Sequence, residues 1–109
     1  MFAVTENKGF QVTFSNGYTI SCQFGATNYC ANYGRHLEPD YQYLEEMRKR
    51  IHTCESCEVA IWKKGVKKWV TTEIIEAMGI EPCFDEDVLA NVTPEEVAKI
   101  MAYLAILEV

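Results

Sequence analysis

Apolar and polar residues alternate through "GFQVTFSNGYTISCQF", residues 9–24, on both sides of an Asn-Gly pair. This pattern is typical of two antiparallel strands joined by a tight turn. A three-residue loop from Ser15 to Gly17 places Val12 opposite Ile20 and gathers the large apolar side chains on one face. We therefore predict that loop, with Gly17 at positive φ in a bulged turn. The predicted apolar face consists of Phe10, Val12, Phe14, Tyr18, Ile20 and Cys22, and the polar face of Gln11, Thr13, Thr19, Ser21 and Gln23.

A second hairpin is predicted for "CEVAIWKKGVKKWVTT", residues 57–72, with its turn at Lys64-Gly65. Both of its faces are rather apolar, which favours a central position in the sheet or cover by a helix. One predicted face carries Val59, Ile61, Val66 and Val70, and the other carries Ala60, Trp62 and Trp69.

Two helices are predicted after this hairpin. Residues 72–79 form a short helix that ends at Gly79. Residues 93–107 begin with Thr93 as N-cap, Pro94 at the first position and Glu96 at the third, which together make a capping box. The apolar residues of this last segment recur at helical spacing and predict a core stripe of Val97, Ile100, Met101, Leu104 and Leu107.

The segment between the two predicted hairpins has no single pattern. Residues 26–40 contain small and turn-forming residues, which indicates an irregular connection. Residues 41–51 fit a short helix, with Leu44, Met47 and Ile51 on one stripe, and also fit a strand.

The overall prediction is an α+β fold, in which a small antiparallel sheet built from two β-hairpins carries a C-terminal amphipathic helix packed on one face.

Composition narrows the class of protein. The chain has 109 residues, of which 49% are hydrophobic and 24% charged, so we expect a single folded domain spanning residues 1–109. No apolar run reaches the length of a membrane span, and the N-terminus lacks signal-peptide features. We therefore expect a cytoplasmic protein with reduced cysteines. A core this small often recruits a second copy, so a homodimer is one option.

Charge is distributed unevenly. Residues 1–72 carry nine Lys or Arg and seven Asp or Glu, whereas residues 73–109 carry one Lys and nine acids. The net charge of −6 argues against direct binding to a nucleic-acid backbone. The acidic third is either a set of solvated helix faces or a surface for a basic partner. Two charged patches stand out, one of Lys63, Lys64, Lys67 and Lys68 and one of Asp85, Glu86 and Asp87. The lysines either blunt the tip of the hairpin or contact phosphates or acids.

The cysteines suggest a possible metal site. "HTCESC" holds Cys54 and Cys57 two residues apart, with His52 just upstream. A structural zinc site usually needs a second ligand pair, and Cys22, Cys30 and Cys83 form none at metal spacing. The alternatives are redox chemistry and small buried thiols. We predict no metal and no cofactor.

No catalytic motif is present. The two histidines, His36 and His52, have no nucleophile context, and neither a P-loop nor a G-x-G-x-x-G occurs. We predict that the protein is not an enzyme and has no catalytic residues.

"QFGATNYC", residues 23–30, is the strongest candidate for a recognition loop. Gln23 and Asn28 offer amides, and rigid aromatic rings bind partners at low entropic cost. The structural alternative is that both amides bond loop backbone while the rings pack. The predicted binding residues are Gln23, Phe24, Asn28, Tyr29, Tyr33, Trp62 and Trp69.

Three segments, "KGFQVTFSNGYTISCQFGATNYC", "CEVAIW" and "VTPEEVAKIM", together resemble a group of small tailed-phage proteins without an established activity. The resemblance covers most of the chain, and it transfers no site residues. It implies an accessory protein that binds and modulates a host protein in the host cytoplasm, as anti-CRISPR inhibitors do. The alternatives are a sponge that sequesters a small nucleotide signal and a structural zinc-binding interaction module.

Overall fold

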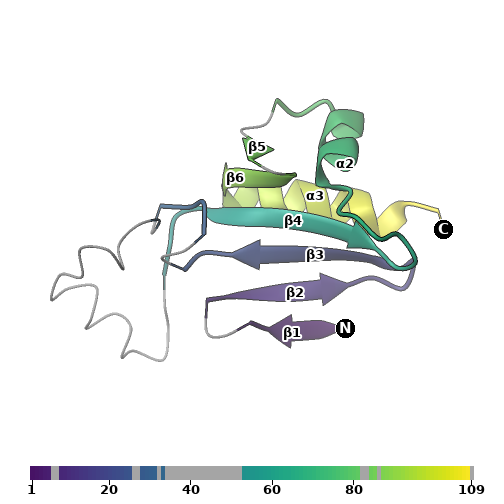
Figure 1. Cartoon of the computed structure of the whole chain (residues 1–109), viewed down its shortest axis with the longest axis horizontal. Helices are drawn as coiled ribbons and strands as arrows, with labels where there is room; N and C mark the ends of the chain where they lie inside the picture. Colours follow the sequence, from purple (N-terminus) through teal and green to yellow (C-terminus); the bar gives the residue numbers. More distant parts are fainter. Residues whose placement is uncertain are drawn as a thin grey trace, which may run out of the picture.

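The computed structural model describes residues 1–5, 8–25, 28–31, 33, 53–81, 84–85 and 87–108. These residues form an α+β fold in which a six-stranded antiparallel sheet carries two helices (Figure 1). The sheet order is β1-β2-β3-β4-β6-β5. The elements are β1 (Phe2–Val4), β2 (Gly9–Thr13), β3 (Tyr18–Gln23), β4 (Cys57–Lys63), α2 (Thr71–Met78), β5 (Phe84–Asp85), β6 (Val88–Val92) and α3 (Pro94–Ile106). The prediction of a helix or strand at residues 41–51 lies outside the described residues.

The first hairpin, β2 and β3, has the predicted register. Val12 pairs with Ile20, and the Phe14 N–H donates to the Tyr18 carbonyl at 2.8 Å. Gly17 has φ of +92°, a conformation that costs a glycine little. The three-residue loop is therefore confirmed, and the apolar set of both strands faces the core.

The predicted second hairpin is wrong in its second half. Strand β4 forms and lies centrally between β3 and β6, but residues 66–70 form no strand. The Val70 N–H donates to the Ile61 carbonyl at 2.8 Å, and helix α2 begins at the next residue. Val66 and Trp69 remain 43% and 46% exposed. The neighbour of β4 on this side is β6, whose apolar residues enter the core, whereas the segment after the turn is rich in lysine.

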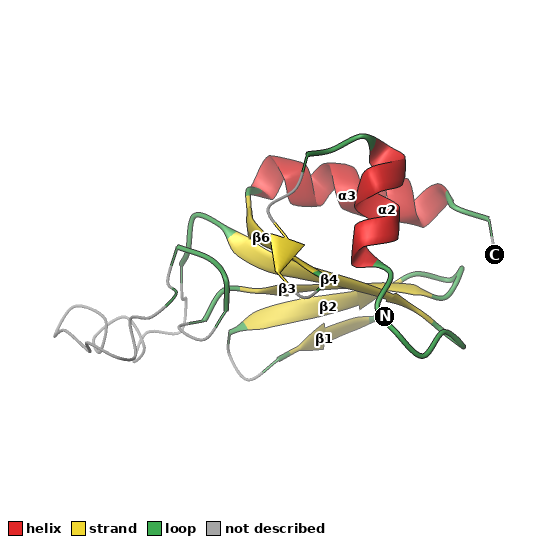
Figure 2. Cartoon of the chain, turned by 45° about the horizontal axis from the view of Figure 1, so that its top comes forward, coloured by secondary structure: helices red, strands yellow, loops and turns green. Residues whose placement is uncertain are grey.

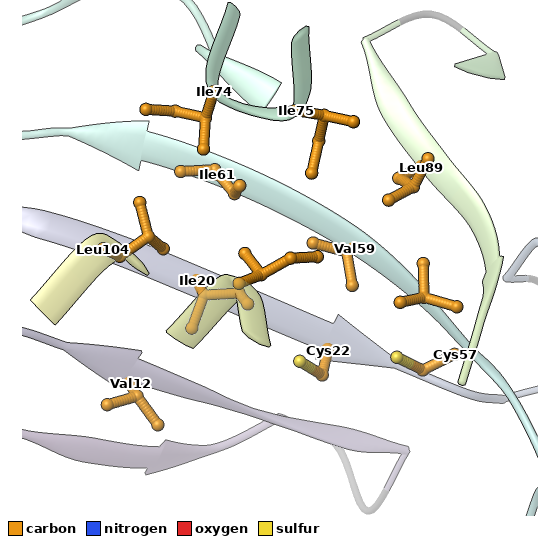
Figure 3. Packing of buried hydrophobic residues seen from close by; sticks show 12 residues of the cluster. Val12, Ile20, Cys22, Cys57, Val59, Ile61, Ile74, Ile75, Leu89 and Leu104 are labelled. Atoms are coloured by element: carbon orange, nitrogen blue, oxygen red, sulfur yellow. The ribbon is translucent and has the colours of Figure 1, made fainter. Parts of the chain in front are cut away.

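Both helices lie on one face of the sheet (Figure 2). The predicted capping box of α3 is present, with the Thr93 hydroxyl accepting from the Glu96 N–H at 3.3 Å. Helix α2 ends at Gly79 in the left-handed conformation, as predicted. Figure 3 shows how these helices and the strands close the core, which consists of Val12, Ile20, Cys22, Cys57, Val59, Ile61, Ile74, Ile75, Leu89, Val92, Ile100 and Leu104. The helix predictions are thus confirmed.

The other face of the sheet carries neither α2 nor α3. Thr19 and Ser21 point to this face and are still only 5% and 6% exposed. Thr19 lies opposite Trp62 in the β3–β4 ladder, and its hydroxyl shares a 2.9 Å hydrogen bond with the Thr13 hydroxyl. Neither described helix has the length and apolar character needed to cross a bilayer.

Candidate binding face

A broad hollow lies on the face of the sheet opposite the helices. Its volume is about 480 Å³, and side chains of β2, β3 and β4 form its floor. Trp62 lines it near Thr19, and Gln23 lines it near the other end of β3. Alternation along the strands produces this floor, because every second residue of each strand points away from the core.

A second hollow of about 350 Å³ adjoins the first and shares two residues with it, Trp62 and Trp69. Lys67 and Lys68 complete it together with Val66. The segment after β4 supplies these side chains, and the hydrogen bond from Val70 to Ile61 holds it against the strand. We call the surface formed by the two hollows the tryptophan face. It contains both tryptophans of the chain.

The described charged residues of the tryptophan face are mostly basic. Lys8, Lys67 and Lys68 line the hollows, and Glu58 is the acid among them. The Glu58 carboxylate accepts the Tyr29 N–H at 2.8 Å, so an internal donor already engages it. The helices on the opposite side expose mainly acids, namely Glu73 and Glu76 of α2 and Glu95 of α3, beside one exposed base, Lys99. The net charge of −6 therefore does not describe this face.

The amides of the predicted recognition loop are used internally. Gln23 accepts from the Thr5 hydroxyl at 2.8 Å and donates to the Ser21 hydroxyl at 3.0 Å. Asn28 is only 8% exposed, and its side-chain oxygen accepts the Gly25 N–H at 3.0 Å. Asn28 thus matches the structural alternative, in which the amides bond loop backbone, whereas Gln23 bonds two side-chain hydroxyls instead.

The predicted aromatic residues do not form one surface. Phe24 packs against the core on the helix side of the sheet. The rings of Tyr29 and Tyr33 contact each other, with centroids 5.1 Å apart, and Tyr33 is 57% exposed. Trp62 and Trp69 share both hollows of the tryptophan face.

The predicted charged patches also separate. The Lys63 ammonium lies 5.1 Å from the centre of the Tyr18 ring, whereas Lys67 and Lys68 line the hollow with the two tryptophans. Lys64 belongs to the turn, where its N–H donates to the Gly17 carbonyl at 2.9 Å.

Of the predicted acidic patch, Asp87 has a structural role. Its carboxylate accepts the Thr72 N–H at 2.7 Å in the first turn of α2, where a negative charge is favourable. Asp85 lies in β5, and Glu86 lies outside the described residues.

Three thiols line an apolar pocket on the core side. Cys22, Cys54 and Cys57 contribute to it, and its volume is about 220 Å³. The neighbouring Cys57 thiol lowers the pKa of Cys22, whereas the neighbouring Cys22 and burial raise the pKa of Cys57. Within the described part of the chain, no three His, Cys, Asp or Glu side chains are placed to hold a metal ion. His52 and Cys83 lie outside that part.

Two sequence patterns indicate these surfaces. The polar face of the first hairpin predicts that Gln11 and Ser21 share a surface with Trp62, once β4 is placed beside β3. Cys57 is two residues before Val59 and four before Ile61. In a strand these residues point to the same side, so the Cys57 thiol lies on the core face.

No protein-family model matches the chain, and no curated protein and no solved structure matches it.

Proposed function

We propose that the chain is a non-catalytic accessory protein that binds an acidic region of another protein through the tryptophan face. The observation that carries this proposal is the pair Trp62 and Trp69, which share a hollow on a sheet face that carries neither described helix. The resemblance to small tailed-phage proteins favours a host protein as the partner. On this proposal the protein acts in the host cytoplasm as an anti-defence factor, by occupying a surface that the host protein needs.

A surface with exposed tryptophan and lysine side chains is suited to binding another protein. Trp is enriched among residues that dominate binding energy, because it buries a large rigid area at low entropic cost. Trp69 is 46% exposed, so a partner can bury much of it. Lys67 and Lys68 lie in the same hollow and favour an acidic partner over a basic one.

The test begins with capture of host proteins on the tagged wild-type chain, followed by purification of the captured protein. Its affinity is then measured by calorimetry for the wild type, for Trp69→Ala and for Tyr33→Ala. Tyr33 is a matched control, because it is an exposed aromatic residue outside the tryptophan face. We expect Trp69→Ala to weaken binding at least about tenfold, as for the loss of a central aromatic residue. A loss with Tyr33→Ala and none with Trp69→Ala would place the interface elsewhere.

A second candidate is a sponge for a small nucleotide. The observation in its favour is that two indole rings and two lysines line one hollow, a combination that suits a stacked base and a phosphate. Cyclic nucleotides and ADP-ribose derivatives should then raise the melting temperature of the wild type. The shift should disappear in Trp69→Ala. An unchanged melting temperature with every nucleotide leaves the protein-binding proposal as the better one.

A further inference from the structure

The thiol-lined pocket is independent of the tryptophan face. It lies on the core side of the sheet, where β3 ends and β4 begins, and it extends to the start of α3. Its surface is mostly apolar, with Phe10, Phe24 and Val97 among its walls. A pocket of about 220 Å³ admits a molecule much larger than water or hydrogen peroxide.

The register of β3 and β4 brings two of the thiols together. Cys22 pairs with Val59, and Cys57 is two residues before Val59, so the two cysteines are diagonal neighbours on the same face. Figure 3 shows their side chains next to each other on the core side. Both side chains are buried, with Cys22 1% and Cys57 8% exposed. Both thiols also line the same pocket.

We propose that Cys22 and Cys57 form an oxidisable dithiol, which a peroxide reaches through the pocket and converts to a disulfide. The Cys22 thiolate attacks one peroxide oxygen, the O–O bond breaks, and the second oxygen leaves as water after taking up a proton. The Cys57 sulfur then attacks the resulting Cys22 sulfenic acid, its own proton leaves with the hydroxyl as a second water, and the S–S bond forms. The two thiols lose two electrons, and the peroxide gains them.

The surroundings of the two thiols set the order in which they react. The neighbouring Cys57 thiol lowers the pKa of Cys22, and the thiolate is the form that reacts with peroxide. The neighbouring Cys22 and burial raise the pKa of Cys57, so Cys22 is the first of the two to react.

Formation of the bond requires a local movement. Diagonal strand neighbours lie roughly 7–8 Å apart at their Cα atoms, whereas disulfides prefer about 4.4–6.8 Å. Cys57 is the first residue of β4, and the pairing of β4 with β6 shifts register between Cys57 and Val59. This strand end is therefore a place where β3 and β4 can approach each other.

The test is peroxide oxidation followed by mapping of the cross-link. The native chain is treated with hydrogen peroxide, remaining thiols are alkylated in denaturant, and tryptic peptides are analysed by tandem mass spectrometry. The main sample is Cys30→Ser/Cys54→Ser, in which a link between peptides 9–35 and 51–63 can join only Cys22 and Cys57. The Cys30 thiol donates to the Gly25 carbonyl at 3.4 Å, and serine keeps a donor there. Circular dichroism checks that each variant is folded.

We expect the linked peptide pair in the wild type and in this double variant, with reversal by a reducing agent. Cys22→Ala and Cys57→Ala should each lose it down to background, while Cys30→Ser alone should retain it. A wild type in which Cys22 and Cys57 remain free, or in which the disulfide joins Cys54 to Cys57, would overturn the proposal.

Discussion

Asn16 connects the turn of the first hairpin to the end of α3. Its side-chain amide donates to the carbonyls of Leu104 and Leu107 at 2.7 and 2.8 Å, and its oxygen accepts the Tyr18 N–H at 3.2 Å. The last carbonyls of a helix have no partner within the helix, so a side chain from elsewhere is favourable there. One residue of the turn thus fixes where the C-terminal helix lies across the sheet.

Asn16→Asp should destabilise the fold. The substitution replaces an N–H donor with a carboxylate oxygen that faces two carbonyl oxygens, so hydrogen bonds are lost and like charges meet. We expect the free energy of unfolding in urea to fall by about 1–3 kcal/mol at neutral pH. Asn91→Asp, at an exposed position, is the matched control and should change it by less than about 0.5 kcal/mol. Equal effects of the two substitutions would show that the contacts of Asn16 with α3 contribute little.

At the scale of elements, residues 70–71 provide hydrogen-bond partners for the backbone of β4, as a neighbouring strand would. The Ile61 carbonyl accepts from Val70, and the Ile61 N–H donates to the Thr71 hydroxyl at 2.9 Å. Both groups belong to a residue with no exposed surface, so each needs a partner within the protein. Thr71 is itself fully buried and starts α2, which couples the helix to the strand.

Thr71→Val tests this coupling. Valine preserves the shape of the side chain but leaves the buried Ile61 N–H without an acceptor, so we expect a loss of about 1–3 kcal/mol in the free energy of unfolding. Thr71→Ser retains the hydroxyl and should lose less. If the serine variant is the less stable of the two in chemical denaturation, packing of the methyl group outweighs the hydrogen bond.

The same elements show what the sequence could predict. The first hairpin and the capping box depend on residues that are close in the chain, such as Asn16 with Gly17 and Thr93 with Glu96, and both were predicted correctly. The strand that pairs with β4 could not be predicted in this way. The segment that follows β4 in the sequence was the local candidate, but β6, much further along the chain, takes the place beside β4. The hydrogen bond of Gln23 could not be predicted either, because its side-chain oxygen accepts from the hydroxyl of Thr5, which is 18 residues away. Local patterns contain no information about that contact.

At the scale of the whole molecule, charge is separated between the two sides of the sheet. Lys8, Lys67 and Lys68 lie on the tryptophan face, and exposed acids lie on the helices of the other side. A partner therefore meets a local field whose sign differs from that of the net charge. Such a field affects association rates more than the strength of the final complex.

Charge reversal on each side tests this separation. Lys67→Glu/Lys68→Glu should slow association with the acidic partner by about tenfold or more at low salt, and the difference should shrink as salt rises. Glu73→Lys/Glu76→Lys changes charge by the same amount, with opposite sign, on α2 and is the control. Stopped-flow or surface-binding kinetics give both rates. A slower association only with the α2 variant would place the binding surface on the helices.

The central claim is that the tryptophan face contacts the partner, and fluorine NMR of the chain labelled with 5-fluorotryptophan tests it most directly. The chain contains two tryptophans, both on this face, and the label leaves the partner silent. We expect two resonances that both move when the purified partner is added, with the change complete at the stoichiometry of the complex. Two unmoved resonances, in a sample where size-exclusion chromatography shows the complex, would contradict the account.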